Sequence, residues 1–280
     1  MQNVSKPIPL FLLFIFNTIF CFAQTQNFNN TKVDSLTFLE TRKTLNNLPT
    51  TKFEKRIYKQ DGKQLPYRLL LPKNYTSTEI YPLVITFHNS TRIGNDNENQ
   101  LEPLSRIWLR EEIYDKYKCF VLAPQFNKRS SNYSENEDGV LISKPSDDVA
   151  MIIDLIKTLE KEYPNIDKDR IYLVGYSMGA STAQNILNRK PKIFAGLIAI
   201  ASVPDYSNLK GIKSKNIWLI HGQKDIENPY EGSVELFKKL KHSKNVIFTT
   251  FSELNHNNIN IPFLLSEEIP NWLFKQSLPD

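Results

Sequence analysis

Short apolar runs alternate with longer segments of helical periodicity over most of this chain. Six of the runs are apolar almost throughout: "PLVITFH", "CFVLAP", "IYLVGY", "AGLIAIAS", "IWLIHG" and "VIFTTF". Continuous apolar runs of this length are typical of strands that are buried on both faces. Strands of this kind, separated by helices, predict an α/β fold with a mostly parallel sheet and helices on both of its faces.

The segments around these runs carry helix and turn signals. Residues 146–163, "SDDVAMIIDLIKTLEKEY", have apolar side chains at helical spacing, and Ser146 is a candidate N-cap. Residues 232–242, "GSVELFKKLKH", predict a second helix. Earlier in the chain, "KRIYK" and "YRLLLP" flank the pair Asp61-Gly62, which is a strong signal for a β-hairpin. We therefore expect one catalytic domain over residues 51–280.

The N-terminal segment has a different character. Lys6 is followed by the apolar stretch "IPLFLLFIFNTIFCFA", which ends at Ala23. This pattern predicts a signal peptide over residues 1–23, a secreted or periplasmic location and no stable membrane insertion after cleavage. An uncleaved membrane anchor is one alternative, and a lipoprotein modified at Cys21 is another. Residues 24–50 are polar and rich in Asn and Thr, and they predict a linker with one short helix.

Composition excludes several function classes. Apolar residues make up 40% of the 280 residues, so the chain can bury a core. The formal net charge of +5 comes from 35 basic and 30 acidic residues that are interspersed, so no nucleic-acid partner is expected. No metal-ligand spacing and no phosphate-binding glycine loop is present, which predicts that no cofactor is needed. Cys119 has no partner once Cys21 is removed, and it is expected to pack as a small apolar residue.

Residues 175–179 read Gly-Tyr-Ser-Met-Gly, directly after a predicted strand and before a predicted helix. In this context the G-x-S-x-G pattern indicates a sharp turn that exposes the hydroxyl of Ser177 as a nucleophile. The amide of Met178, at the start of the helix, would then face a developing oxyanion. The alternative is an ordinary glycine-rich turn.

A serine nucleophile needs a base, and the chain has four histidines. His88 and His221 each end a predicted strand and suit structural hydrogen bonds. His242 lies at the polar end of a helix and is expected at the surface. His256 lies in the polar loop "SELNHNN" after the last predicted strand, where it can reach Ser177, and it is our candidate base.

The orienting acid is expected between nucleophile and base in chain order. Asp225 follows the strand "IWLIHG" at the same edge of the sheet and is our candidate. Asp205, which follows the preceding strand, is the main rival. Glu227 and Glu231 are nearby competitors, and Glu231 also suits the first turn of a helix.

Several motifs resemble the secreted α/β-hydrolase esterases that are related to polyhydroxybutyrate depolymerases and to feruloyl and acetylxylan esterases. These motifs are "YRLLLPKNY", "YPLVITFHNSTRIGNDN", "VLAPQF", "IDKDRIYLVGYSMGA" and "IWLIHGQKD", and the resemblance spans roughly residues 51–275. It implies an α/β-hydrolase fold with an eight-stranded sheet, with Ser177 as nucleophile, Asp225 as acid and His256 as base.

The resemblance also implies that the backbone after His88 supplies a second oxyanion donor, which would be the amide of Ser90. Relatives usually read H-G-x-G here, whereas this chain has Asn89 and Thr91 in place of the two glycines. The oxyanion hole is therefore the part of the site where this chain departs from the family.

Together these features predict a secreted serine carboxylic-ester hydrolase that acts on a small-molecule or carbohydrate ester. A peptidase of the prolyl-oligopeptidase type, which usually carries an N-terminal propeller, is one alternative; an inactive hydrolase-fold binding protein is another. The long polar segment 125–143 is expected to shape the substrate pocket. Aromatic surface for a substrate could come from Phe126, Tyr133, Tyr206 and Tyr230, unless these side chains pack on their own loops.

Overall fold

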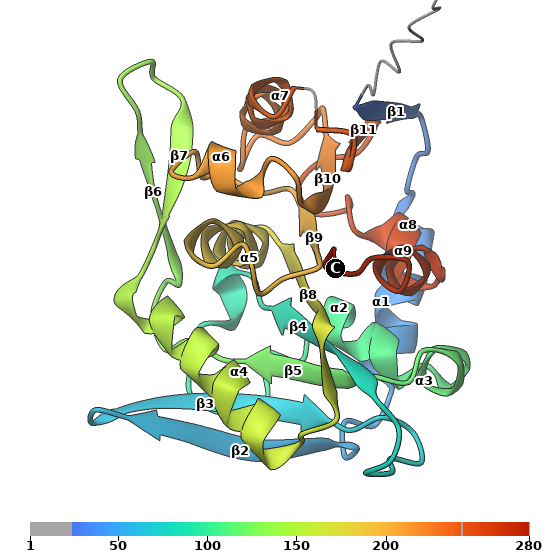
Figure 1. The fold of residues 1–280 in the computed structure, drawn as a ribbon. Helices are drawn as coiled ribbons and strands as arrows, with labels where there is room; N and C mark the ends of the chain where they lie inside the picture. Colours follow the sequence, from blue (N-terminus) through green and yellow to red (C-terminus); the bar gives the residue numbers. More distant parts are fainter. Residues whose placement is uncertain (1–23, 242, 280) are drawn as a thin grey trace, which may run out of the picture.

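The computed structural model of this chain describes residues 24–241 and 243–279. The predicted signal peptide, residues 1–23, and the predicted surface residue His242 lie outside the described residues. Figure 1 shows a twisted central sheet with helices on both of its faces, and a two-stranded hairpin beside α5.

Nine strands of the described residues form the central sheet, in the order β1-β11-β10-β9-β8-β4-β5-β3-β2. The pairs β2–β3 and β3–β5 are antiparallel, and the other neighbouring pairs are parallel. The strands are β1 (Thr25–Asn29), β2 (Phe53–Gln60), β3 (Lys63–Leu70), β4 (Tyr81–Phe87), β5 (Phe120–Pro124), β8 (Ile166–Tyr176), β9 (Gly196–Ile200), β10 (Asn216–Gly222) and β11 (Val246–Phe251). Two further strands, β6 (Ser131–Glu135) and β7 (Leu141–Pro145), form a separate antiparallel hairpin. The mostly parallel sheet predicted from the apolar runs is confirmed.

Helices cover the two faces of the sheet in two groups. One face is packed by α4 (Ala150–Glu162), α5 (Met178–Arg189), α6 (Leu209–Ile212) and α7 (Tyr230–Lys239). The other face is packed by α1 (Ser35–Asn46), α2 (Pro103–Arg106), α3 (Glu111–Lys116), α8 (Ile261–Leu264) and α9 (Glu268–Leu273). Three 3-10 turns complete the described elements: η1 (Ser90–Arg92), η2 (Ile107–Leu109) and η3 (Asp147–Val149).

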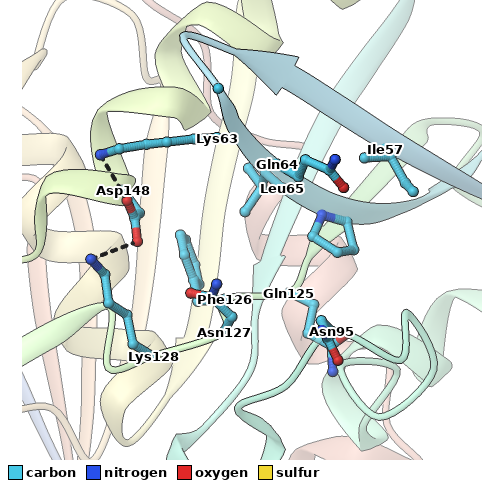
Figure 2. A pocket seen from close by; sticks show the side chains of 12 residues that line it. Ile57, Lys63, Gln64, Leu65, Asn95, Gln125, Phe126, Asn127, Lys128 and Asp148 are labelled. Atoms are coloured by element: carbon cyan, nitrogen blue, oxygen red, sulfur yellow. Dashed lines mark hydrogen bonds and ion pairs between the residues drawn. The ribbon is translucent and has the colours of Figure 1, made fainter.

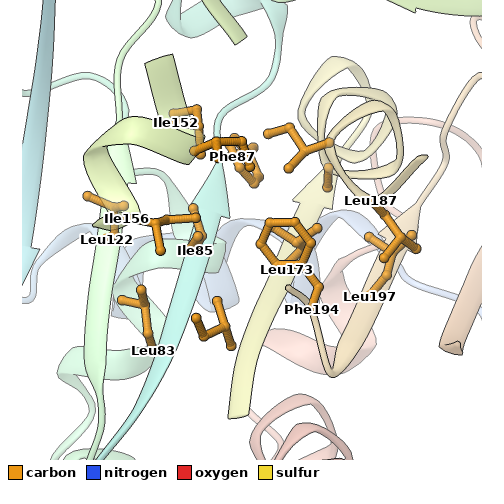
Figure 3. Close-up of a cluster of buried hydrophobic side chains, with 14 of the residues drawn as sticks. Leu83, Ile85, Phe87, Leu122, Ile152, Ile156, Leu173, Leu187, Phe194 and Leu197 are labelled. Atoms are coloured by element: carbon orange, nitrogen blue, oxygen red, sulfur yellow. The ribbon is translucent and has the colours of Figure 1, made fainter. Parts of the chain in front are cut away.

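The core consists of two apolar clusters, one on each face of the sheet. Along β4, Leu83, Ile85 and Phe87 belong to the first cluster, which Figure 3 shows with Ile152 of α4. Val84, between them, belongs to the second cluster. Side chains of a strand alternate between the two faces, and both faces are covered here. A continuous apolar sequence is the result, which is why these strands could be predicted.

Residues 24–50 are part of the fold rather than a linker. The strand β1 pairs with β11 from Thr25–Ile247 to Asn29–Phe251, and α1 buries Leu45 fully. This strand raises the sheet from the predicted eight strands to nine. The difference has a physical reason: all five residues of β1 are exposed, so an edge strand here needs no apolar pattern.

The predicted β-hairpin and the predicted helix start at Ser146 differ in outcome. Asp61 and Gly62 connect β2 to β3 with positive φ angles of 49° and 74°, so the predicted hairpin is confirmed. Ser146 is the N-cap residue of η3, which runs directly into α4, but its side chain makes no capping hydrogen bond. The helix predicted from residue 146 is therefore α-helical only from Ala150.

Candidate active site

Ser177 occupies the sharp turn between β8 and α5. Its φ of 57° and ψ of −126° lie outside the regions that L-residues ordinarily adopt. The turn is possible because both flanking glycines lie against backbone: a Cβ at Gly175 would collide with Gly179, and a Cβ at Gly179 would collide with Phe87. The two glycines of the motif are thus required by close approach, and Ser177 carries the strain.

The hydroxyl of Ser177 belongs to a chain of hydrogen bonds. His256 Nε2 lies 2.8 Å from Ser177 Oγ, and His256 Nδ1 lies 2.7 Å from Asp225 Oδ2. Because a carboxylate can only accept, Nδ1 donates to Asp225 and Nε2 accepts the serine proton. The three residues come from the ends of β8, β10 and β11, which neighbour each other at the carboxyl edge of the sheet through β9. The structure therefore brings together the three residues that the sequence selected.

The carboxylate of Asp225 accepts hydrogen bonds at both oxygens. Oδ1 accepts from the amides of Glu227 and Asn228, and Oδ2 accepts from His256 and from His221 Nε2 at 3.1 Å. Burial alone would raise the pKa of Asp225, but the hydrogen bonds from the two histidines and the Asn228 amide hold that pKa well below its usual range. Asp225 is thus an anion throughout the neutral range.

The rival acids lie elsewhere or face the wrong side of the imidazole. Asp205 accepts from Asn185 Nδ2 at 2.9 Å and from the amide of Ser207 at 2.8 Å, with no bond to His256. Glu227 lies 3.8 Å from His256 Nε2, the nitrogen that faces the serine. Glu231 is in the first turn of α7, in agreement with its alternative interpretation.

The backbone between His88 and Arg92 forms η1 rather than a glycine turn. Asn89 caps it: its Oδ1 accepts from the amide and the hydroxyl of Thr91, and its Nδ2 donates to the buried carboxyl of Glu102. His88 Nδ1 donates to the carbonyl of Asn89 at 2.8 Å, and its Nε2 accepts from the amide of Phe126 at 3.0 Å. The loop is thus held in place by side-chain hydrogen bonds.

The two residues predicted as oxyanion donors both begin a helical turn. Ser90 is the first residue of η1, and Met178 is the first residue of α5. First-turn amides have no acceptor within their own helix. Both amides are therefore free to donate, and Ser90 also lines the pocket that contains Ser177.

Burial accounts for two further pKa shifts around this loop. It lowers the pKa of His88 to about 4, so this imidazole is neutral in agreement with its two hydrogen bonds. It also raises the pKa of Glu102 to about 8, and the nearby charge of Arg92 only partly offsets that effect. The prediction that His88 and His221 serve in structural hydrogen bonds agrees with these contacts.

Comparisons with known proteins address the fold. The family model described as the prolyl oligopeptidase family matches residues 138–215, which include Ser177. Among solved structures, the chain resembles one described as a thermostable esterase, with 31% identity and a TM-score of 0.73 over 81% of this chain and 63% of that one. This chain thus spans less than two thirds of that esterase. The comparison with curated proteins gave no match.

More distant structures show the same architecture. An esterase from Pyrococcus furiosus has 20% identity and a TM-score of 0.59, over 89% of this chain and 99% of that one. Dipeptidyl peptidase 4 from Porphyromonas gingivalis has 17% identity and a TM-score of 0.57, over 80% of this chain and 35% of that one. The chain has an α/β-hydrolase fold. In α/β-hydrolases the nucleophile is carried by a strand-to-helix turn of this kind.

The pocket in front of Ser177 has a volume of about 360 Å³. Its walls come from α1, η1, the end of β8 and the loops after β10 and β11. The lining residues are Phe38, Arg42, Asn89, Ser90, Thr91, Arg92, Tyr176, Ser177, Glu227, His256 and Asn257. Tyr176 also donates a hydrogen bond to the carbonyl of His256 at 2.7 Å, which positions the loop that carries the imidazole.

The segment 125–143 does not line this pocket. Its hairpin packs instead on α5, where Ser130 Oγ lies 2.7 Å from Thr182 Oγ1 and Ser131 Oγ lies 2.8 Å from Asn185 Oδ1. The four aromatic candidates, Phe126, Tyr133, Tyr206 and Tyr230, are also absent from the pocket lining. The prediction that this segment shapes the pocket at Ser177 is therefore wrong. Its polar side chains form hydrogen bonds with side chains of α5 instead.

A larger pocket, of about 500 Å³, lies between the β2–β3 hairpin and the loop after β5 (Figure 2). Lys63 and Lys128 both pair with Asp148 at its rim, each at 3.1 Å. Ser177 and His256 do not line it. It holds no activated nucleophile, so the chemistry belongs to the smaller pocket.

The described residues contain neither a cluster suited to a metal ion nor a helix suited to span a membrane. No group of three or more His, Cys, Asp or Glu side chains in residues 24–241 and 243–279 could hold a metal ion. No helix in the same ranges is long and apolar enough to cross a bilayer. Cys119 is buried and unpaired in this part of the chain, and burial raises the pKa of its thiol.

Sequence reasoning missed two kinds of site residue. Phe38 and Arg42 lie on α1, in the segment that was predicted as a linker, and the apolar cluster "VDSLTFLE" was the only signal there. His221 was expected to be structural, but its contact with Asp225 was not foreseen. Its position four residues before Asp225, at the end of a strand, was the available signal.

Proposed function

We propose that this α/β-hydrolase protein is a serine hydrolase that cleaves carboxylic esters through an acyl-enzyme on Ser177. The observation that carries the proposal is the chain of hydrogen bonds from Asp225 through His256 to Ser177 Oγ, which ends at a strained serine beside a pocket. A serine hydroxyl is a weak nucleophile, and a neutral imidazole that is oriented by a carboxylate activates it.

Acylation uses the three side chains in order. Ser177 Oγ attacks the ester carbonyl carbon while His256 Nε2 takes the hydroxyl proton, and the carbonyl oxygen becomes an oxyanion. The amides of Met178 and Ser90 donate to that oxyanion. The bond to the alcohol oxygen then breaks, and His256 returns the proton to the departing alcohol. Asp225 remains ionised and stabilises the imidazolium.

Deacylation repeats the sequence with water. His256 takes a proton from a water molecule, whose oxygen attacks the acyl carbonyl. The second oxyanion forms at the same amides, the bond to Ser177 Oγ breaks, and the proton passes back to the serine oxygen. The carboxylic acid leaves and the enzyme is restored. His256 carries the proton in both half-reactions, so acylation and deacylation share one base.

Ester hydrolysis is favoured over peptide hydrolysis by the comparison at 31% identity, which is with a thermostable esterase. The narrower relation to polyhydroxybutyrate depolymerases and to feruloyl and acetylxylan esterases rests on sequence motifs alone: "RLLLP" and "GNDN" in combination with the turn at Ser177. A small or carbohydrate-linked ester suits a pocket of about 360 Å³. The second candidate is a serine peptidase, favoured by the match of the prolyl oligopeptidase family model to residues 138–215.

A substrate panel separates the two candidates. We expect kcat/KM for acetyl, butyryl or feruloyl esters to exceed kcat/KM for proline-containing peptides of similar size, and Ser177→Ala to abolish hydrolysis. Faster cleavage of the peptides would support the peptidase instead. Asp205→Asn changes a buried carboxylate outside the pocket and is the matched control for correct folding.

We also propose that the protein is exported and loses residues 1–23, on the basis of the apolar segment that ends at Ala23. Mass spectrometry of the exported protein is expected to give an N-terminus at Gln24. An N-terminus at Met1, or a lipid on Cys21, would contradict this location.

A further inference from the structure

Two arginines lie on one wall of the pocket that contains Ser177. Arg42 comes from α1, and Arg92 comes from η1, two residues after Ser90, the predicted oxyanion donor. The guanidinium of Arg42 lies 5.3 Å from the centre of the Phe38 ring, which also lines the pocket. Two segments far apart in the sequence therefore place two cations beside the nucleophile.

The guanidinium groups of Arg42 and Arg92 have hydrogen-bond donors that are not paired with protein acceptors in the described residues. In the described ranges, Arg42 and Arg92 form no ion pair, and no side-chain hydrogen bond runs from either to a protein acceptor; the Nε of Arg92 is buried without a partner. Arg56, Arg68 and Arg110 each pair with a glutamate. A guanidinium offers five donors, and leaving a buried donor unpaired is unfavourable. The pocket thus presents donors that lack acceptors.

The acidic groups around the pocket do not neutralise this wall. The charges of both arginines lower the pKa of Glu102, but burial outweighs them and raises this pKa to about 8. The carboxyl is therefore protonated at neutral pH. Glu227 lies on the loop after β10, 3.8 Å from His256 Nε2, and accepts from Asn257 Nδ2 rather than from either arginine. The wall formed by α1 and η1 therefore remains positive.

We propose, on the basis of the hydrolase function above, that the pocket takes esters that carry a carboxylate, which Arg42 and Arg92 bind while the ester carbonyl lies at Ser177. Guanidinium groups pair with carboxylates through parallel hydrogen bonds, which fixes orientation as well as charge. The volume of about 360 Å³ limits the substrate to a small ester. Half-esters of dicarboxylic acids and esters of hydroxy acids are the two classes that fit.

Matched substrate pairs test the preference and locate the carboxylate. A higher kcat/KM for monomethyl succinate than for methyl butyrate would place the substrate carboxylate on the acyl side of the ester. A higher kcat/KM for O-acetylglycolate than for propyl acetate would place it on the alcohol side. We expect kcat/KM to favour the anionic member of at least one pair by about tenfold or more, as charge-assisted hydrogen bonds allow. Arg42→Gln and Arg92→Gln should each lower that anionic-to-neutral ratio by about tenfold. Lys43→Gln removes the same charge from the exposed face of α1 and should keep the ratio.

Binding to the Ser177→Ala variant separates this proposal from the hydrolase function. Calorimetry is expected to give tighter binding of the preferred anionic ester than of its neutral partner, and Arg42→Gln added to Ser177→Ala should remove the difference. Equal binding of both members in both pairs, or a ratio that falls equally in Lys43→Gln, would overturn the carboxylate site. Selective binding without turnover in the unmodified protein would contradict the hydrolase function and leave the site supported.

Discussion

His221 Nε2 lies 3.1 Å from Oδ2 of Asp225, the oxygen that also accepts from His256. The same Nε2 lies 2.9 Å from the carbonyl of Asn228, so it must carry the proton, and Nδ1 accepts from the hydroxyl of Ser233 at 2.7 Å. His221 is fully buried. Its hydrogen bonds fix the orientation of the Asp225 carboxylate, and through it the orientation of His256.

We predict that His221→Phe lowers kcat by about tenfold, because one charge-assisted hydrogen bond to Asp225 is lost. KM should change little, since His221 does not line the pocket. His221→Gln keeps a donor and should restore part of kcat. The NMR signal of the proton between His256 and Asp225 should shift in His221→Phe. An unshifted signal with a general loss of stability would mean that His221 only supports packing.

Ser177→Ala, His256→Ala and Asp225→Asn are each predicted to lower kcat by about 10³-fold or more. The double variants should lose little beyond the single ones, because the three side chains act as a unit. Steady-state kinetics on a chromogenic ester measures this. If Asp205→Asn lost activity on the same scale while Asp225→Asn did not, the assignment of the acid would be wrong.

Ser90→Pro tests the amide of Ser90 as an oxyanion donor. Proline removes only that N–H, and it suits the first position of a helical turn after Asn89, whose φ of −77° and ψ of 175° are extended. We predict a loss of about 10²–10³-fold in kcat. Ser90→Ala, which keeps the amide, should stay within about tenfold. Similar kinetics for the two variants would exclude this donor.

Glu102 is predicted to make stability depend on pH. Unfolding returns its pKa from about 8 to its ordinary value of 4.5, so between these values the unfolded state binds fewer protons than the folded state. The stabilising contribution of Glu102 to the free energy of unfolding is fully present below about pH 4.5 and is lost as the pH rises through about 8. Glu102→Gln can still accept from Asn89 but does not titrate.

The melting temperature of the unsubstituted protein should therefore fall more between about pH 5 and about pH 9 than that of Glu102→Gln. Glu40→Gln, at an exposed position of α1, is the matched control and should follow the unsubstituted protein. A constant difference between Glu102→Gln and the unsubstituted protein across this range would show that Glu102 is already ionised in the folded state.

The sequence was informative where burial or a sharp turn constrains it. The strands β4 and β10 and the second half of β8 are buried and mostly apolar on both faces, and Gly175 and Gly179 are required by close backbone contact. Ser177, Asp225 and His256 could be selected because each follows a strand at the same edge of the sheet. These features are local, and the parallel topology then brings them together.

The rest depended on contacts between distant segments. The exposed strand β1 has no apolar pattern, so its pairing with β11 could not be predicted. Arg42 reaches the pocket only because α1 packs against the second apolar cluster through Leu45. The loop at Asn89 is held by a hydrogen bond to Glu102, which lies thirteen residues later in the chain.

Covalent labelling of Ser177 tests the central claim most directly. A fluorophosphonate reacts with an activated serine: its phosphorus bonds to Oγ, the P–F bond breaks and fluoride leaves, while the base takes the hydroxyl proton. We predict that peptide mass spectrometry of the labelled, folded protein finds the adduct on Ser177, that Ser177→Ala shows none, and that His256→Ala labels far more slowly. A folded protein that acquires no label on Ser177 and hydrolyses no ester would contradict the hydrolase function and support a binding protein with a hydrolase fold.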